Sequence, residues 1–95
     1  MNKLEEARQI IDQVDLELIE LFKKRMAASK MVAEFKALNN LPIYNEEREK
    51  NLINKNLNSL NSKELEKYYL EFLEVILKVS KDYQKDLIKW GNMVY

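Results

Sequence analysis

The apolar residues of the first forty positions recur at intervals of three and four. This spacing puts one stripe on a single helical face, and the stripe reads Leu4, Ala7, Ile11, Val14, Leu18, Leu21, Ala28, Val32 and Phe35. The pattern predicts one helix over residues 2–38. At 1.5 Å per residue this helix is ~55 Å long, whereas a globule of this size has a radius of gyration of only ~13 Å. One copy cannot cover such a rod, so we expect two or more chains to share the stripe.

Two shorter helices are predicted after a break. Asn39 suits a helix C-cap, Pro42 cannot continue the ladder, and Asn45 then suits the N-cap of a second helix that ends near Asn58. A third helix is predicted from a cap at Asn61 or Ser62 to about Ile88, with apolar residues at Leu65, Tyr69, Phe72, Ile76, Val79 and Tyr83. The fold class is therefore all-α, with residues 1–95 as one helical domain. Residues 90–95 are expected to be a frayed tail or a small apolar dock.

Composition excludes several kinds of chemistry. The chain has no cysteine and no histidine, which removes thiol nucleophiles, disulfides, imidazole acid–base catalysis and the usual zinc sites, so we expect no cofactor and no metal. Sixteen basic residues balance sixteen acidic ones, so no overall field favours nucleic acid. The charged N-terminal segment does not resemble a signal peptide, and no stretch approaches a membrane span. We expect a cytoplasmic protein.

Polar residues interrupt two apolar stripes. Arg25 fills the gap between Leu21 and Ala28, where an unpaired charge is costly, and Lys36 returns to nearly the same azimuth three turns later. Together these cations could bracket a small dianion; alternatively, Arg25 pairs with a glutamate of a neighbouring helix or reaches out to solvent, and Lys36 is a solvated helix end.

The third predicted helix carries a second stripe that includes two hydrogen-bonding residues. This stripe reads Leu73, Leu77, Ser80, Gln84 and Leu87. Ser80 and Gln84 are four residues apart, so they can address one ligand together, or they can bond to each other and to the backbone.

Two further regions offer charged groups. Arg48 and Glu49 lie near the N-terminus of the second predicted helix, where an anion or a hydroxyl is readily bound. Arg8 lies ~25 Å from Arg25 along the first helix, too far for both to meet one small molecule within one chain. A partner chain could bring Arg8 to the site; otherwise it pairs with Glu5 or Asp12 on its own helix.

Taken together, these features resemble the all-helical chorismate mutase family over nearly the whole chain. The resemblance is carried by Arg8, Ile11, Asp15, Leu18 to Leu21, Arg25, Lys36, Pro42, Arg48, Glu49, Ser80 and Gln84. It implies an intertwined homodimer of three-helix chains that rearranges chorismate to prephenate, in the branch leading to phenylalanine and tyrosine. Each active site would be completed by an arginine from the other chain.

The resemblance also implies roles for the site residues. Arg25, with Arg8 of the partner subunit, would bind the two substrate carboxylates. Lys36 and Gln84 would reach the ether oxygen, and Lys36 a carboxylate as well. Ser80 would bond the ring carboxylate, Glu49 would accept from the ring hydroxyl, and Arg48 would help through its backbone and charge. The apolar walls are expected from Val32, Leu52 and Leu77.

Two positions depart from the family pattern. Asn45 stands where an aspartate is usual; it is a candidate substrate contact that can cap the helix and accept a hydrogen bond without the negative charge. Lys81 occupies a place that is more often apolar. Two alternatives stay open: an isochorismate-pyruvate lyase, against which Glu49 argues, and a non-catalytic helical dimerisation or regulatory module.

Overall fold

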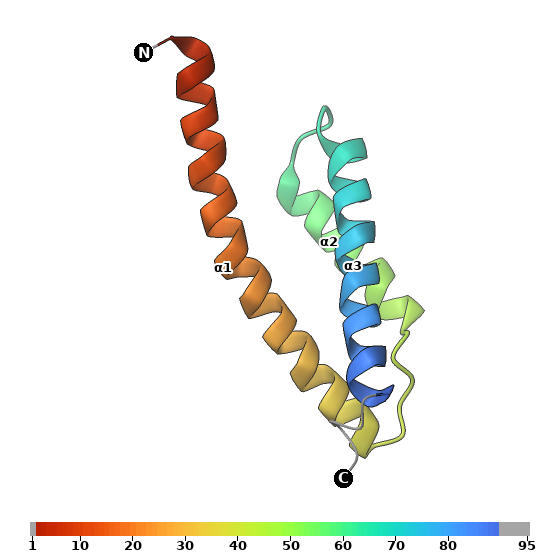
Figure 1. The fold of residues 1–95 in the computed structure, drawn as a ribbon. Helices are drawn as coiled ribbons and strands as arrows, with labels where there is room; N and C mark the ends of the chain where they lie inside the picture. Colours follow the sequence, from red (N-terminus) through yellow and green to blue (C-terminus); the bar gives the residue numbers. More distant parts are fainter. Residues whose placement is uncertain (1, 90–95) are drawn as a thin grey trace.

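The computed structural model describes residues 2–89 of the chain, and these residues form three helices. They are α1 (Lys3–Leu38), α2 (Glu46–Leu60) and α3 (Glu66–Lys89), and α3 packs against both of the others (Figure 1). The N-terminal half of α1 diverges from α2 and α3 and projects beyond them. The predicted all-α class and the very long first helix are confirmed.

The two ends of α1 are fixed by asparagines. Asn2 is the N-cap, and its side-chain oxygen accepts a hydrogen bond from the Glu5 backbone N–H at 2.9 Å. Asn39 is the C-cap, and its side-chain amide donates to the Phe35 carbonyl at 2.8 Å. Asn40 follows with a φ of 54°, a left-handed conformation that asparagine tolerates well. The chain then turns back towards α2, as the Asn39–Pro42 break predicts.

The junction between α2 and α3 differs from the sequence prediction. Helix α2 continues two residues beyond Asn58, and Asn61 is its left-handed C-cap, with φ 48° and ψ 47°, rather than the N-cap of the next helix. Ser62 instead caps a turn, because its Oγ accepts from the Leu65 backbone N–H at 3.4 Å. Helix α3 therefore begins at Glu66, a few residues later than predicted.

The buried face of α3 matches the predicted stripe. Its buried residues are Leu73, Leu77, Ser80, Gln84 and Leu87. Leu87 packs on Ala33 of α1 in a small core against which Ala37 and Tyr83 are also packed. The interior of one chain is thus narrow, and it includes two polar side chains of α3.

The predicted stripe of α1, by contrast, lies open in the single chain. The buried residues of α1 are Ser29 and Ala33, whereas stripe residues such as Leu21 are exposed, in this case by 60%. The chain measures 56 × 26 × 15 Å with a radius of gyration of 16.8 Å, against ~13 Å for a compact globule of similar length. It exposes 7835 Å², whereas a compact monomer of this mass would expose ~5,800 Å².

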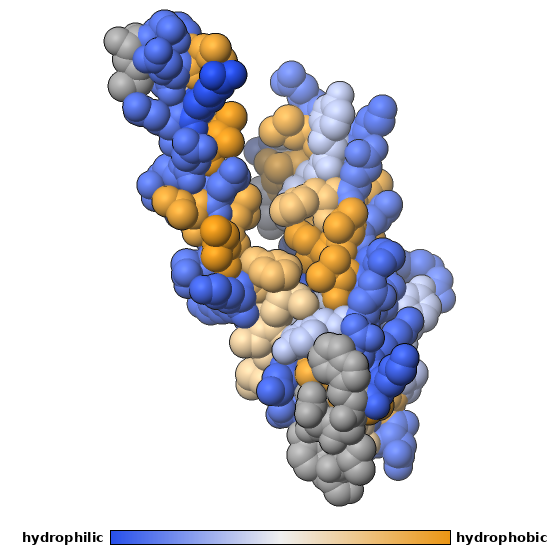
Figure 2. All heavy atoms as spheres, viewed as in Figure 1, coloured by the Kyte–Doolittle hydropathy of each residue, from blue (hydrophilic) through white to orange (hydrophobic). Residues whose placement is uncertain are grey.

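Apolar side chains gather on the facing sides of α1 and α3 (Figure 2). A groove of 350 Å³ lies between them, lined by Leu18, Leu21, Phe22, Arg25, Met26, Phe72, Val75, Ile76 and Val79. Eight of these nine residues are apolar, so this groove is more hydrophobic than the solvent-exposed surface of a typical soluble monomer.

Among residues 2–89, no helix has the length and apolarity needed to cross a bilayer. The predicted role of residues 90–95 lies outside the described residues.

Candidate functional site

A second cavity, of 320 Å³, lies where α1, the loop before α2, the start of α2 and α3 meet. Seven of the eight predicted site residues line it: Arg25, Lys36, Asn45, Arg48, Glu49, Ser80 and Gln84. The predicted wall residues Val32, Leu52 and Leu77 line it too, as do Ala28, Ser29, Ile43 and Lys81. The fold therefore gathers residues from all three helices around one small volume.

The charge of this cavity is strongly positive. Four cationic side chains line it, against the one carboxylate of Glu49; the cations are Arg25, Lys36, Arg48 and Lys81. Within residues 2–89, the ion pairs leave Arg25, Lys36 and Arg48 without an acidic partner. The alternative of a glutamate that neutralises Arg25 is therefore not realised in the described part of the chain. Such an arrangement attracts a small anion.

Arg25 is half-buried in the middle of α1 and lines both the charged cavity and the apolar groove. Burial lowers the pKa of its guanidinium, and the positive charge of Arg48 lowers it further, with a small opposing effect of Tyr69. The guanidinium nevertheless stays charged at any ordinary pH. Two arginines whose charges repel each other in one cavity are typical of an anion-binding site.

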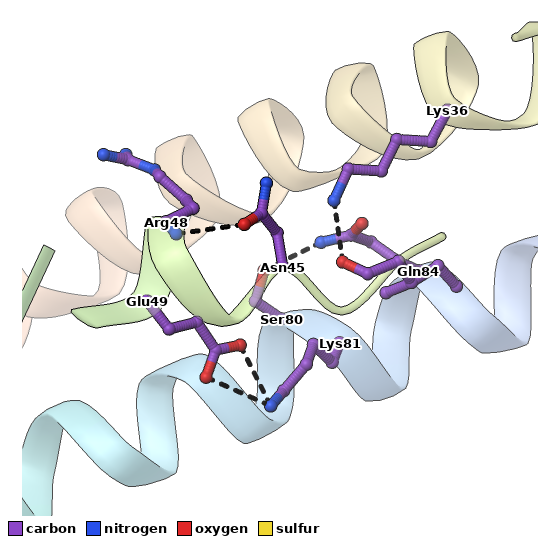
Figure 3. Close-up of polar contacts among 8 residues, drawn as sticks. Lys36, Asn45, Arg48, Glu49, Ser80, Lys81 and Gln84 are labelled. Atoms are coloured by element: carbon purple, nitrogen blue, oxygen red, sulfur yellow. Dashed lines mark hydrogen bonds and ion pairs between the residues drawn. The ribbon is translucent and has the colours of Figure 1, made fainter. Parts of the chain in front are cut away.

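Lys36 enters the cavity from the last turn of α1. Its Nζ donates a hydrogen bond to the Ile43 carbonyl at 2.7 Å, which ties the loop to the helix (Figure 3). An ammonium group has three protons, so two remain for other acceptors. The loop thus holds this cation in place without neutralising it.

Asn45 caps α2 from the same loop. Its Oδ1 accepts from the Arg48 backbone N–H at 3.0 Å, so the predicted capping is confirmed. This hydrogen bond leaves a second lone pair on Oδ1 and the protons of Nδ2 available, so contact of Asn45 with a ligand stays a prediction. Asn45 fixes the first turn of α2, and with it the backbone of Arg48 and Glu49.

Glu49 of α2 forms an ion pair with Lys81 of α3 (Figure 3). The Lys81 Nζ lies 3.0 Å from Oε2 and 3.3 Å from Oε1 of Glu49, and 4.8 Å from the centre of the Tyr44 ring. An apolar residue is more usual at the position of Lys81. The ion pair with Glu49 explains how this position accommodates a cation.

Ser80 and Gln84 belong to a buried hydrogen-bonded chain that begins on α1. Gln84 Nε2 donates to Ser80 Oγ at 3.2 Å, and Ser80 Oγ lies 2.6 Å from Ser29 Oγ. The two residues bond to each other, as one alternative held, and they also line the cavity. Gln84 Oε1 is buried with no hydrogen-bond partner among the described residues.

Arg8 lies apart from the other site residues. It is exposed on the N-terminal part of α1 and does not line the cavity. One chain therefore does not bring Arg8 to the other seven residues, as the length of the helix predicts. Its contribution from a partner chain stays a prediction.

Ser29 also lines the cavity, and it was not predicted from the sequence. It stands four residues after Arg25 and seven before Lys36, so all three share one face of α1. This spacing is the signal that could have identified it.

No cluster of three or more carboxylate, imidazole or thiol groups that could hold a metal occurs in the described part of the chain.

The chemical capacity of the cavity follows from these contacts. Fixed cations can bind a dianion, the Gln84 amide and the serine hydroxyls can donate hydrogen bonds, and Glu49 can accept one. Such a site can orient a small dicarboxylic acid and stabilise charge that develops on an oxygen.

Comparison with known proteins gives two matches. The model of a family described as chorismate mutase type II matches residues 7–85. A bifunctional chorismate mutase/prephenate dehydratase of Aquifex aeolicus (strain VF5) is 39% identical over 55 residues. That alignment covers 58% of this chain and 15% of the Aquifex protein, so the chain corresponds to a small part of that relative. No solved structure matches the chain.

Proposed function

The chain belongs to the chorismate mutase type II family, and on this premise we propose that it rearranges chorismate to prephenate. The cavity supports this activity, because three of its four cations have no acidic partner within residues 2–89 while a neutral amide, Gln84, lies beside them. Chorismate is a dianion with an ether bond, so it needs positive groups for its carboxylates and donors for its ether oxygen.

The reaction matches the side chains that the cavity contains. One C–O bond breaks and one C–C bond forms within the same molecule, and no proton, electron or nucleophile is exchanged. Catalysis then depends on holding the compact reactive conformer and on stabilising negative charge at the departing ether oxygen. Arginine, lysine and glutamine perform both tasks without histidine or cysteine, which the sequence lacks.

In the proposed mechanism, three residues of the cavity contact the carboxylates and the ether oxygen of the substrate. The apolar walls of the cavity surround these contacts. Arg25 binds one carboxylate through its planar guanidinium, which suits bidentate contact. Lys36 contacts the ether oxygen and a carboxylate with the protons that Ile43 leaves available. Gln84 donates to the same ether oxygen, and the apolar walls exclude water and strengthen these contacts.

Three further residues of the cavity act on the ring side of the substrate. Glu49 accepts from the ring hydroxyl, Ser80 donates to the ring carboxylate, and Arg48 adds positive charge at the start of α2. Asn45 holds that start in place through its cap. Because Asn45 lacks a negative charge, it contributes geometry and does not repel the substrate.

We further propose that the active protein is a homodimer whose partner completes the site. The apolar groove and the exposed stripe of α1 adjoin the charged cavity through Arg25, which lines both cavity and groove. A second long helix laid antiparallel along this stripe buries the apolar surface. It also brings Arg8 of the partner subunit towards Arg25, where it supplies the second arginine.

The test is a direct assay of the purified chain. Loss of chorismate absorbance, with prephenate identified as the product, is the expected result. The same assay with isochorismate should release no pyruvate. Release of pyruvate from isochorismate without conversion of chorismate would replace the mutase by a lyase, and inertness towards both would leave a non-catalytic module.

A further inference from the structure

The ion pair between Glu49 and Lys81 differs from the other ion pairs of the described residues. Those pairs join residues three or four positions apart in the sequence, and their side chains are 39–95% exposed. Lys81 and Glu49 are 32 positions apart, join α3 to α2, and are only 26% and 21% exposed. Partial burial and a cross-helix geometry make this pair less screened and more specific than a surface pair.

The position of Glu49 makes its charge important. It is the one carboxylate that lines a cavity proposed to receive a dicarboxylate. An uncompensated carboxylate there repels the ligand, and in the partly desolvated cavity this repulsion is stronger than in water. Lys81 offsets the charge while leaving the lone pairs of Glu49 on the cavity side able to accept a hydroxyl proton.

The other contact of Lys81 limits the freedom of its ammonium group. The group lies 4.8 Å from the centre of the Tyr44 ring, where a cation is attracted by the ring face, and both carboxylate oxygens lie within 3.3 Å of it. The lysine is therefore held between the loop and α2, and it is directed at Glu49.

We propose that Lys81 is a positioning residue, which orients and neutralises Glu49 so that this carboxylate can accept the ring hydroxyl of the substrate. This inference rests on the proposed function. It assigns to Lys81 no contact with the substrate itself, and it predicts that the effect of Lys81 on substrate affinity requires the negative charge of Glu49.

A double-mutant cycle with Lys81→Met and Glu49→Gln tests the inference, with KM for chorismate as the readout. Lys81→Met should raise KM about tenfold, with a smaller change in kcat, because the bare carboxylate repels the substrate. In the Glu49→Gln background, Lys81→Met should change KM less than about twofold. Lys81→Arg, which keeps the positive charge, should keep KM close to the wild-type value.

The chain offers a matched control in Lys78→Met. Lys78 pairs with Asp82 on the same helix at 2.7 Å, but this pair is exposed and does not line the cavity. The substitution should leave KM and kcat unchanged. Circular dichroism of each variant checks that the helices form, and Lys81→Gln, which removes the charge but keeps a polar side chain, provides the test if Lys81→Met does not fold.

The outcomes separate the two hypotheses. An equal rise of KM in the Glu49 and Gln backgrounds overturns the inference, because Lys81 would then bind the substrate directly. An unchanged KM in Lys81→Met also overturns it. Failure of the wild-type protein to convert chorismate refutes the proposed function, whereas normal wild-type turnover with additive substitutions refutes only the role of Lys81.

Discussion

The Oγ atoms of Ser29 and Ser80 lie 2.6 Å apart, buried between α1 and α3. Two hydroxyls in contact share one proton in their mutual hydrogen bond, and the other proton is available to a neighbour. Ser80 Oγ also accepts from Gln84 Nε2, so the orientation of the amide depends on both serines. Ser29 thus contributes to the geometry of the cavity from a different helix.

Removal of the Ser29 hydroxyl should disturb this geometry. In Ser29→Ala, the Ser80 hydroxyl can rotate freely, and we expect kcat/KM to fall about tenfold and the free energy of unfolding to fall by ~1 kcal/mol. Steady-state kinetics and urea unfolding measure the two effects. Ser59→Ala, at an exposed position of α2, is the matched control. Unchanged turnover in Ser29→Ala would show that the serine pair matters only for packing.

Lys36 should be essential for turnover but not for the fold. We expect Lys36→Ala to lower kcat by about 10²–10³-fold, because it removes a fixed donor to the developing charge. Arg25→Ala should lower kcat/KM comparably. Lys30→Ala, at an exposed position of the same helix, should leave the rate unchanged. A Lys36→Ala protein with normal helicity and normal turnover would contradict the mechanism.

The amide of Gln84 predicts a rate that does not depend on pH near neutrality. A carboxyl group in its place can donate to the ether oxygen only when it is protonated. The Gln84→Glu variant should therefore lose activity as the pH rises through the pKa of the new carboxyl group, which is ~4.3 in water and which burial raises and the neighbouring cations lower. Profiles of kcat/KM from pH 4.5 to 8 test this prediction. Equal profiles for both proteins would exclude hydrogen-bond donation from this position.

The proposed action of Arg8 from the partner chain can be tested by mixing two inactive variants. Arg8→Ala and Lys36→Ala subunits, unfolded and refolded together, form heterodimers in half of the molecules if they associate at random. Each heterodimer has one intact site, so activity should return to about a quarter of the wild-type value. No recovery from a mixture that contains heterodimers would place the action of Arg8 within its own chain.

The exposed stripe of α1 predicts that dimerisation and activity are linked. Leu21→Glu puts a charge into the apolar groove, and we expect sedimentation analysis to show loss of the dimer together with activity. Lys23→Glu changes the charge at an exposed position of the same helix and should leave the dimer intact. A wild-type monomer with full activity would contradict the shared site.

Much of the fold follows from the periodicity of the sequence. The stripe from Leu73 to Leu87 identified the buried face of α3, including its two polar members, and Asn45 identified the start of α2. The start of α3 was predicted wrongly because asparagine favours both a helix N-cap and a left-handed C-cap. Asn61 adopts the second of these conformations.

The site was predicted less completely, because periodicity shows which residues share a face but not which faces meet. Gaps in a stripe identified Arg25, Ser80 and Gln84. The Lys81–Glu49 and Ser29–Ser80 contacts join residues 32 and 51 positions apart, and no local pattern predicts such pairs. They depend on how three helices pack around a cavity.

The partial burial of Arg25 beside Arg48 has a thermodynamic consequence. Because burial, and after it the charge of Arg48, lower the pKa of Arg25, the folded chain holds this positive charge at a cost in stability, and the cost persists at every pH below that pKa. A neutral side chain in place of either arginine is therefore expected to raise the free energy of unfolding. The two arginines together favour a bound anion, because its negative charge offsets their repulsion.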